Sequence, residues 1–208
     1  EMARPPCVMS RFPLAALPIA LALAATAALA QAPAPAFDPI NFDLVKDSGI
    51  GFVTNSSRTA HRHQPETMVS GVALFDFDND GLLDVFLTNG AKMTGLDKTD
   101  PVFWNRLYRN LGSWRLEDVT EKAGLQGHGN DNGVATADYD NDGWTDLFVA
   151  GLRENVLYRN KGDGTFEDTT AKAGLKNPDP DHGTLWAVAA AFFDYDKDGD
   201  LDLFVSNY

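Results

Sequence analysis

The chain repeats one pattern three times, and this repeat constrains its fold more than any other feature. Each copy has an apolar start, a loop rich in Asp and a second apolar run, at residues 71–89, 133–151 and 187–207. The first loop aspartates, Asp76, Asp138 and Asp194, are 62 and 56 residues apart, so the unit is about 59 residues long. A repeat of this length indicates an array of units that bury their apolar faces against one another.

Each unit predicts four short strands. The first is rich in Gly, Ala and Val, which suits a strand crowded by its neighbours, and the second is a continuous apolar run, which indicates burial on both faces. The third carries Leu-Tyr-Arg-Asn, at 107–110 and again at 157–160, and a Gly turn leads to the fourth, at 114–120 or 165–170. Four strands per repeat predict an all-β fold, a β-propeller of four-stranded blades, because the repeats of a β-solenoid are much shorter.

The third copy stops after its second strand. The chain is therefore expected to cover about two and a half blades and to be an N-terminal fragment of a closed ring. A fainter copy at 40–50 precedes the first unit, since Asp43 and Gly49 have the same spacing as Asp118 and Gly124. We expect this segment to be an outer strand that completes the last blade.

The Asp-rich loops are the strongest candidates for a functional site. We call residues 76–84, 138–146 and 194–202 the first, second and third Asp loops. Asp recurs at relative positions 1, 3, 5 and 9, and the Gly at position 6 permits a sharp turn that a Cβ atom would hinder. This turn is expected to direct the carbonyl oxygen of position 7 inward. The expected ligands are Asp76, Asp78, Asp80, Leu82 and Asp84, then Asp138, Asp140, Asp142, Trp144 and Asp146, then Asp194, Asp196, Asp198, Asp200 and Asp202.

Oxygen ligands in this number, on a flexible loop, favour Ca²⁺ over zinc or copper, while Mg²⁺ would keep more of its water. An EF-hand shares positions 1, 3, 5 and 6 but requires Glu at position 12, where this chain has Leu87, Val149 and Val205. The other alternative is that the loops are polar hairpins that bind nothing. Four aspartates in each loop would then repel one another without a counter-ion, so Ca²⁺ is the expected cofactor.

A family resemblance rests on these motifs. The Asp loops with their flanking apolar strands resemble the FG-GAP or VCBS repeats of integrin-like propellers. The run Gln-Pro-Glu-Thr-Met-Val-Ser-Gly at 64–71, with Leu-Tyr-Arg-Asn and Asp-x-Thr-x-x-Ala-Gly-Leu, is similar to bacterial relatives of cartilage acidic protein, the ASPIC/UnbV type. The resemblance covers about residues 40–208 and implies a calcium-binding propeller. It implies less about function, since such propellers serve many roles.

The first residues predict a signal peptide. Met9 is a plausible start, Arg11 supplies a basic region, and an Ala- and Leu-rich core follows at 14–29 with a small-residue cleavage site. An uncleaved membrane anchor is the alternative, although Pro18 interrupts this weakly apolar core. We expect a signal peptide with an upstream extension at 1–30, a linker at 31–37 and the propeller at 38–208. The protein is then secreted, periplasmic or on the cell surface, with no membrane insertion after cleavage.

The charge of the chain limits its partners. Thirty Asp and Glu stand against 17 Lys and Arg, for a net charge of −13, and the twelve aspartates at positions 1, 3, 5 and 9 of the Asp loops supply most of the excess. Nucleic acid and anionic lipid are therefore not expected partners, because both require clustered cations. The only cysteine, Cys7, falls in the expected signal peptide, which excludes disulfides and cysteine nucleophiles in the folded part.

Other side chains give weaker indications. His63, His128 and His182 each precede the first Asp of a loop by 10 to 13 residues. One interpretation is a cluster of imidazoles that binds a metal at one mouth of the ring; the commoner case is loop residues without a role. Glu66 is an isolated candidate acid or base. Arg109 and Arg159 recur in equivalent places, which favours an architectural role, for example ion pairs with Asp118 and Asp168.

Two functions remain from the sequence. The leading one is an exported, calcium-stabilised propeller that acts as a binding or adhesion module for an extracellular protein or carbohydrate. The other is an extracellular enzyme on the same scaffold, such as a polysaccharide lyase or hydrolase, which would need non-repeated polar residues on one face. The non-repeated segments, 51–70 and 90–104, show no such set, and the chain has no Gly-x-Ser-x-Gly motif. The sequence therefore predicts a protein that is not an enzyme.

Overall fold

The computed structural model describes residues 44–68, 70–176 and 185–208, and residues 44–208 form one unit. The expected signal peptide and linker lie outside the described residues, as does His182. Within the described ranges, no helix is long and apolar enough to cross a membrane.

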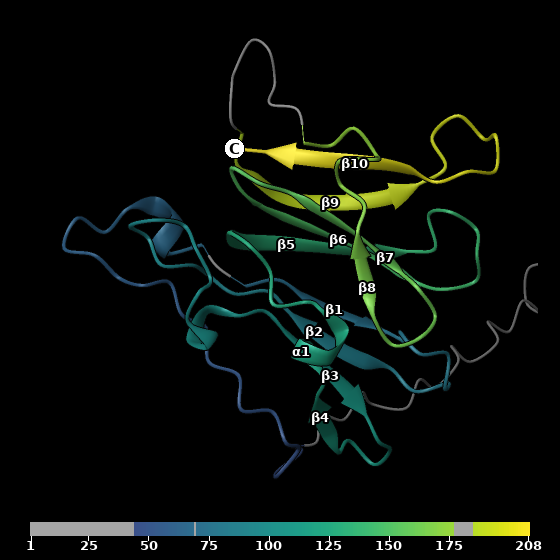
Figure 1. Ribbon diagram of the computed structural model, residues 1–208, viewed down its shortest axis with the longest axis horizontal. Coiled ribbons are helices and arrows are strands. Elements are labelled where there is room, and N and C mark those ends of the chain that lie inside the picture. Colours follow the sequence, from purple (N-terminus) through teal and green to yellow (C-terminus); the bar gives the residue numbers. More distant parts are fainter. Residues whose placement is uncertain (1–43, 69, 177–184) are drawn as a thin grey trace, which may run out of the picture. The chain divides into compact units, whose positions relative to one another are not determined.

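Two antiparallel four-stranded sheets and a two-stranded sheet follow one another along the chain (Figure 1). The strands of the first sheet are β1 (Val72–Phe75), β2 (Asp84–Leu87), β3 (Arg106–Asn110) and β4 (Leu116–Asp118). Those of the second are β5 (Asn130–Ala137), β6 (Asp146–Leu152), β7 (Val156–Asn160) and β8 (Phe166–Asp168). The third sheet pairs β9 (Ala187–Phe193) with β10 (Asp202–Asn207). The prediction of four-stranded, blade-like units in an all-β chain is confirmed.

Within the described residues, short helical turns occupy three connections: η2 (Gln64–Glu66), η3 (Pro101–Phe103) and α1 (Thr120–Ala123). α1 ends at Gly124, which adopts the left-handed conformation at φ 77° and so terminates the turn. A turn of this length leaves no helical periodicity in the sequence. The predicted fourth strand at 114–120 is accordingly shorter, because β4 ends at Asp118 and α1 begins two residues later.

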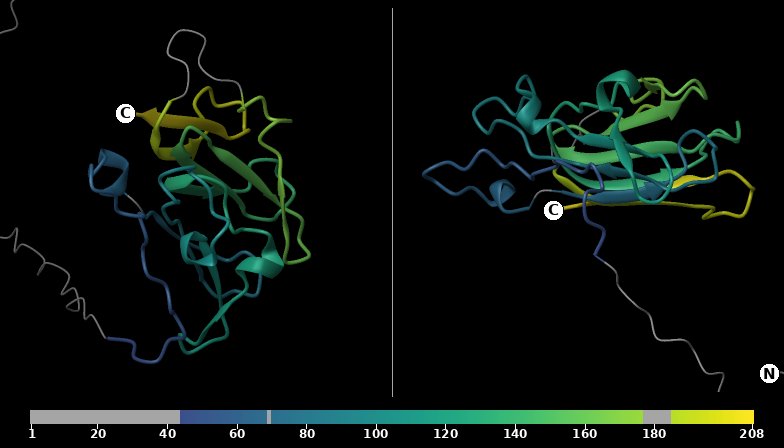
Figure 2. Two further views of the ribbon diagram at one scale, coloured as in Figure 1. Left: turned by 60° about the vertical axis from the view of Figure 1, so that its left-hand side comes forward. Right: turned by 90° about the horizontal axis from the view of Figure 1, so that it is seen from below.

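The first strands of successive sheets lie beside one another, and glycine permits their close approach (Figure 2). A Cβ atom on Gly71 would lie 2.5 Å from the carbonyl oxygen of Asn132, and one on Gly133 would lie 2.6 Å from that of Val188. Neither distance is tolerable for a side chain. The small residues of these strands therefore permit the close packing of neighbouring strands that the sequence predicted.

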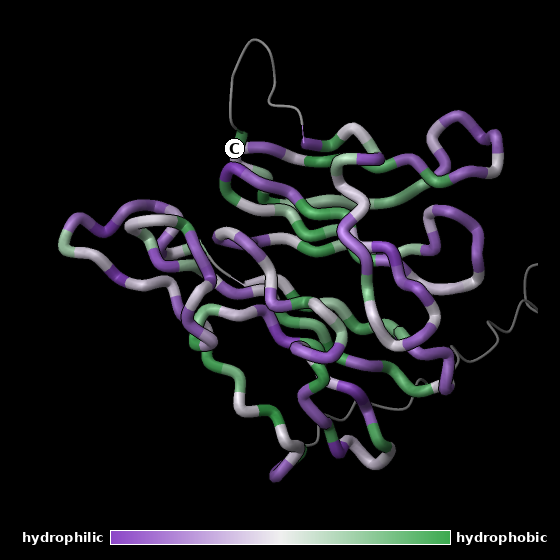
Figure 3. The backbone as a smooth tube through the Cα atoms, viewed as in Figure 1, coloured by the Kyte–Doolittle hydropathy of each residue, from purple (hydrophilic) through white to green (hydrophobic). Residues whose placement is uncertain are grey.

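The core lies between the sheets, and β6 contributes to both sides of it. Leu147 and Val149 pack with Phe86 and Leu107 of the first sheet, whereas Phe148 and Ala150 pack against the third sheet. Alternate residues of a strand point to opposite faces, so a strand covered on both faces is apolar throughout. In the backbone coloured by hydropathy, the strands are accordingly the hydrophobic part of the molecule (Figure 3).

The segment before the first sheet also follows the repeat. Ser48 accepts a backbone hydrogen bond from Leu116 of β4, at 2.7 Å, and Gly49 lies against the Leu116 carbonyl. Gly124 lies beside the Phe166 carbonyl of β8 in a looser version of this contact. Ser48 and Gly49 therefore lie beside the outer strand of the first sheet, as Gly124 lies beside that of the second. The outer strand predicted at 40–50 is not found at residues 44–50, which form no strand, while residues 40–43 lie outside the described residues.

Candidate metal centres

The three Asp loops connect the first and second strands of their sheets and lie at one end of the stack, where the backbone is hydrophilic (Figures 1 and 3). The first aspartate organises each turn. Asp76 accepts hydrogen bonds from the backbone N–H groups of Asp80, at 3.1 Å, and Gly81, at 2.8 Å. Asp138 accepts the equivalent pair from Asp142 and Gly143. Gly81 has φ 85°, a conformation that glycine adopts freely, so sequence and loop shape agree.

The ninth-position aspartate fixes the other side of the loop. Asp84 is fully buried and accepts backbone hydrogen bonds from Phe77, at 3.0 Å, and from Asn110 of β3, at 2.8 Å. Burial raises the pKa of Asp84 from 3.8 to about 6, although both hydrogen bonds oppose the shift. Asp146 has the same two partners in the second sheet, Tyr139 and Asn160, and burial likewise raises its pKa to about 6.

Carboxylate oxygens converge in all three loops. Positions 1, 3 and 9 each offer an oxygen, and the three oxygens lie within 4.8 Å of one another; the residues are Asp76, Asp78 and Asp84, then Asp138, Asp140 and Asp146, then Asp194, Asp196 and Asp202. Oδ1 of Asp78 is buried and has no hydrogen-bond partner. A buried, unpaired carboxylate oxygen is costly unless a cation or donor satisfies it. This orphan oxygen fits a bound hard cation.

The position-5 aspartates lie outside these groups. Oδ1 of Asp80 accepts the N–H of Leu82 at 2.9 Å, and Oδ2 accepts a hydrogen bond from Arg109 at 3.2 Å. Asp142 has the same two kinds of partner, Trp144 N–H and Arg159. The structure therefore brings together three of the four predicted carboxylates of each loop. The carbonyl ligands at Leu82, Trp144 and Asp200 stay a prediction.

The prediction that Arg109 and Arg159 form ion pairs with Asp118 and Asp168 was wrong. Nε of Arg109 lies 2.6 Å from Oδ2 of Asp78, and Arg159 pairs in the same way with Asp140 and Asp142. Asp118 instead pairs with Arg106, at 3.5 Å, and Asp168 with Lys176, at 3.8 Å. The register explains the error. Asp118 is the cross-strand partner of Tyr108, and the side chain of Arg109 points to the opposite face.

The third loop differs from the other two. Asp202 is exposed, and the N–H of Tyr195 donates to its Oδ2 at 2.9 Å. In the first and second sheets a third strand supplies a further donor to the equivalent aspartate, whereas the described part of the third sheet has only β9 and β10. The third loop thus has the same candidate ligand residues, but its ninth-position aspartate is less buried and has fewer hydrogen-bond donors around it.

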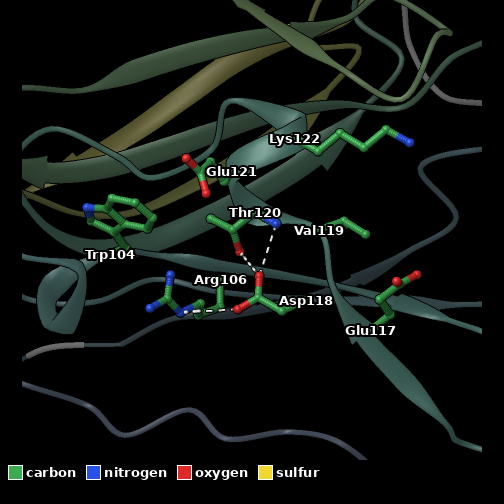
Figure 4. Close-up of a pocket in the computed structure, with 8 residues that line it drawn as sticks. All are labelled: Trp104, Arg106, Glu117, Asp118, Val119, Thr120, Glu121 and Lys122. Carbon is green, nitrogen blue, oxygen red and sulfur yellow. Dashed lines mark hydrogen bonds and ion pairs between the residues drawn. The ribbon is translucent and has the colours of Figure 1, made fainter.

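A groove lies away from the Asp loops, beside β3, β4 and α1 (Figure 4). Its volume is about 710 Å³, and its lining residues are Trp104, Arg106, Glu117, Asp118, Val119, Thr120, Glu121 and Lys122. The Arg106 guanidinium lies 5.4 Å from the centre of the Trp104 ring and also pairs with Asp118. The second sheet has Glu154 and Val156 where this sheet has Trp104 and Arg106, so the groove is not part of the repeat.

The segment 51–70 carries the candidates that the sequence left open. Glu66 is buried, and its carboxylate accepts hydrogen bonds from the Thr59 hydroxyl, the Thr59 N–H and the His63 N–H. The Thr59 hydroxyl above all lowers the pKa of Glu66, so this side chain is an ionised loop anchor. His63 and His128 are exposed, and no candidate metal group within the described residues includes a histidine.

A buried ion pair in the other non-repeated segment was missed by sequence reasoning. Nζ of Lys98 lies 3.0 Å from Oδ2 of Asp131 on β5, and both side chains are 2% exposed. Lys98 also donates to the Asn89 carbonyl and to the Asn105 side chain. Burial lowers the pKa of Lys98, and the Asp131 carboxylate opposes this shift. The pair joins the 90–104 loop to the second sheet. One signal for Lys98 was present in the sequence, its position in a segment that is not part of the repeat.

Comparison with known proteins identifies the repeat. The model of the FG-GAP-like repeat matches residues 76–149 and, in a second overlapping match, residues 138–205. Together the two matches span more than half of the chain and include all three Asp loops. Among curated proteins, none matches the sequence.

Proposed function

This chain belongs to the family of FG-GAP-like repeat proteins, and from that premise we propose that it is an exported, calcium-binding β-propeller that acts as a binding or adhesion module. The observation that carries the proposal is the convergence of carboxylates at positions 1, 3 and 9 in three equivalent loops. The orphan oxygen of Asp78 supports a cation in the first of them.

Calcium in this protein would be structural. The first Asp loop brings Asp76, Asp78 and Asp84 together, and we expect the position-7 carbonyl oxygen and the position-5 carboxylate of each loop to complete the coordination. A bound Ca²⁺ supplies the positive charge that offsets the repulsion among these carboxylates. Export, which we infer from residues 1–30, would place the loops in calcium-rich surroundings, where affinities on the order of 10⁻⁴–10⁻³ M suffice.

Thermal unfolding with and without calcium tests the metal assignment. At 10 mM Ca²⁺ and affinities of that order, each site adds about 1.4 to 2.7 kcal/mol to the free energy of unfolding, because the metal binds the folded loops far better than the unfolded chain. We expect a higher melting temperature in Ca²⁺ than in EGTA, and a smaller effect of Mg²⁺ at equal concentration. An unchanged melting temperature would reject calcium as the cofactor.

We propose the Trp104 groove as the surface that contacts a carbohydrate ligand. Its aromatic ring, guanidinium and carboxylates can stack on a sugar ring and bond to its hydroxyl groups. An extracellular protein remains the other class of ligand, and we expect neither nucleic acid nor membrane insertion. A glycan array followed by calorimetry tests the assignment. Trp104→Ala should abolish binding, whereas Trp114→Ala, a change at an exposed tryptophan outside the groove, should not.

The alternative is an extracellular enzyme such as a polysaccharide lyase or hydrolase. The polar groups described here do not favour it, because Asp118 pairs with Arg106 and bonds to Thr120, and Glu66 is held by its own loop. A general acid or base needs a side chain free to exchange a proton with substrate. Depolymerisation of any glycan retained on the array would favour the enzyme over the binding module.

A further inference from the structure

Two arginines reach the Asp loops from the third strands of their sheets. Nε of Arg109, on β3, lies 2.6 Å from Oδ2 of Asp78, and its Nη2 lies 3.2 Å from Oδ2 of Asp80. Arg159, on β7, contacts Asp140 through Nε and Asp142 through Nη2. An arginine therefore contacts the same two loop positions in both sheets: Arg159 donates hydrogen bonds to both carboxylates, whereas Arg109 donates one to Asp80 and pairs with Asp78 by charge alone. A planar guanidinium suits this geometry, because it can bridge two carboxylates at fixed angles.

The arginine contacts one oxygen of each carboxylate and leaves the other to the loop. In Asp78, Oδ2 faces Arg109, while the buried Oδ1 has no partner and Asp78 contributes to the converging group. In Asp80, Oδ2 faces the arginine and Oδ1 accepts the N–H of Leu82. Arg109 thus faces one oxygen of Asp78 and leaves the buried Oδ1 free for a ligand of the loop.

The third loop shows the arrangement without an arginine. Among the described residues, no basic side chain pairs with Asp196 or Asp198. Here Oδ1 of Asp196 accepts the N–H of Asp198 at 3.2 Å. The position-1 aspartate also changes partner, from the N–H of position 5 in the first two loops to that of Lys197, at 2.6 Å.

We propose that Arg109 and Arg159 are positioning residues of the calcium sites, which hold the position-3 and position-5 carboxylates with one oxygen turned toward the metal. The inference rests on the proposed calcium function. A positive charge near the site repels Ca²⁺, so electrostatics alone predicts that loss of the arginine tightens Ca²⁺ binding. The positioning role predicts the opposite, namely that loss of the arginine weakens Ca²⁺ binding. Groups that orient metal ligands from outside the coordination shell typically change affinity by about 10- to 100-fold when they are replaced.

The second loop allows a site-specific test, because Trp144 belongs to it and can excite the luminescence of bound Tb³⁺, an oxygen-seeking ion that substitutes for Ca²⁺. Titrations of Tb³⁺, and its displacement by Ca²⁺, are made in a Trp114→Phe background, which removes a tryptophan from the turn between β3 and β4. Arg159→Lys keeps the charge and loses the fork. We expect it to weaken Ca²⁺ binding by about 10-fold or more. Arg153→Lys, a change at an exposed arginine in the connection between β6 and β7, is the control and should leave the affinity unchanged.

The outcomes separate the two proposals. If the parent protein binds neither Tb³⁺ nor Ca²⁺, the calcium function itself is wrong. If the parent binds and Arg159→Lys binds equally well or more tightly, calcium stands and the positioning role is overturned. Circular dichroism and the melting temperature in EGTA establish that each variant is folded. Should Arg159→Lys fail to fold, Arg109→Lys is titrated by calorimetry with Ca²⁺ instead, where the same loss is expected and an unchanged affinity overturns the role.

Discussion

Asn79 connects the first Asp loop to the second, because its Nδ2 donates to the carbonyl oxygen of Gly143 at 3.0 Å. Asn141 of the second loop continues the series and donates to Asp200 of the third, at 3.2 Å. Position 4 of the first and second loops points outward, as the alternation of side chains predicts, and its amide bonds to the next loop. The Asp loops are therefore joined to one another, and not only to their own sheets.

Asn79→Ala should consequently destabilise the protein, although Asn79 is not a metal ligand. The substitution removes a hydrogen bond between sheets and places alanine at φ 56°, a left-handed conformation that asparagine tolerates better. We expect a loss of about 1–2 kcal/mol in a urea titration. Asn79→Gly loses the hydrogen bond without the backbone strain and should cost less. Equal costs for the two variants would show that backbone strain contributes nothing at this position.

Gly133→Ala tests the crowding of the first strands. The added Cβ would lie 2.6 Å from the carbonyl oxygen of Val188 and 3.0 Å from Cα of Ala189, both of which are backbone atoms that move only with the strand. We expect a loss of about 1–3 kcal/mol or more in the free energy of unfolding. Gly51→Ala is the control, because its Cβ would meet nothing within 4 Å. A neutral Gly133→Ala would mean that β5 and β9 are further apart than described.

The pair of Lys98 and Asp131 predicts a strongly non-additive double mutant. Lys98→Met leaves the Asp131 carboxylate buried with Asn105 as a remaining donor, at 2.7 Å, and should cost about 3–5 kcal/mol. Lys98→Met combined with Asp131→Leu removes both charges and should cost less than the sum of the single changes. Urea titrations of the four proteins give the coupling energy. Additive costs would show that the two charges do not interact.

Metal-free protein should lose stability as the pH rises from about 4 to about 6. Burial raises the pKa of Asp84 and of Asp146 from 3.8 to about 6 in the folded state. Between these values the folded chain binds protons that the unfolded chain does not, so each unit of pH costs stability until both carboxylates are ionised. Thermal melts in EGTA across this range check the direction, and Asp84→Asn should flatten the profile. A stability that increases over the same range would contradict the raised pKa values.

The sequence predicted what depends on local pattern and on repetition. Asp76, Gly81 and Asp84 recur at fixed spacing because each loop needs a turn anchor, a left-handed residue and a buried closing carboxylate. The continuous apolar run of β6 predicted burial on both faces, and Leu147 and Phe148 confirm it. These features are encoded within a few residues of one another, so they can be derived without knowledge of the tertiary structure.

Contacts that depend on strand register or on neighbouring units could not be predicted. Arg109 lies nine residues from Asp118 in the sequence, yet the pairing of β3 with β4 places the two on opposite faces. The partner of Asn79 is 64 residues away, in another sheet. The contact of Arg109, from β3, with Oδ2 of Asp78 likewise depends on the strand register. Spacing within a repeat identifies the ligand residues, but their orientation depends on residues from other strands.

The two ends of the stack predict self-association of this chain. β1 exposes Val72 and Leu74, at 61% and 54%, and the third sheet exposes Phe193 and Phe204, at 44% and 58%. In the second sheet the equivalent faces are covered by a sheet on each side, and exposed apolar patches of this kind favour association. We expect oligomers or aggregates in size-exclusion chromatography with light scattering, with Ca²⁺ present.

Substitutions that introduce a charge at each end of the stack test this prediction. Leu74→Glu combined with Phe204→Glu should shift the protein toward the monomer, because each end then presents a charge where a second copy would bury its apolar face. Glu121→Gln, at an exposed position outside both ends, should leave the association unchanged. A monomeric parent protein with a cooperative melt would show that the open stack of sheets is self-sufficient. The interpretation of β1 and β10 as blade faces that need a neighbour would then have to be abandoned.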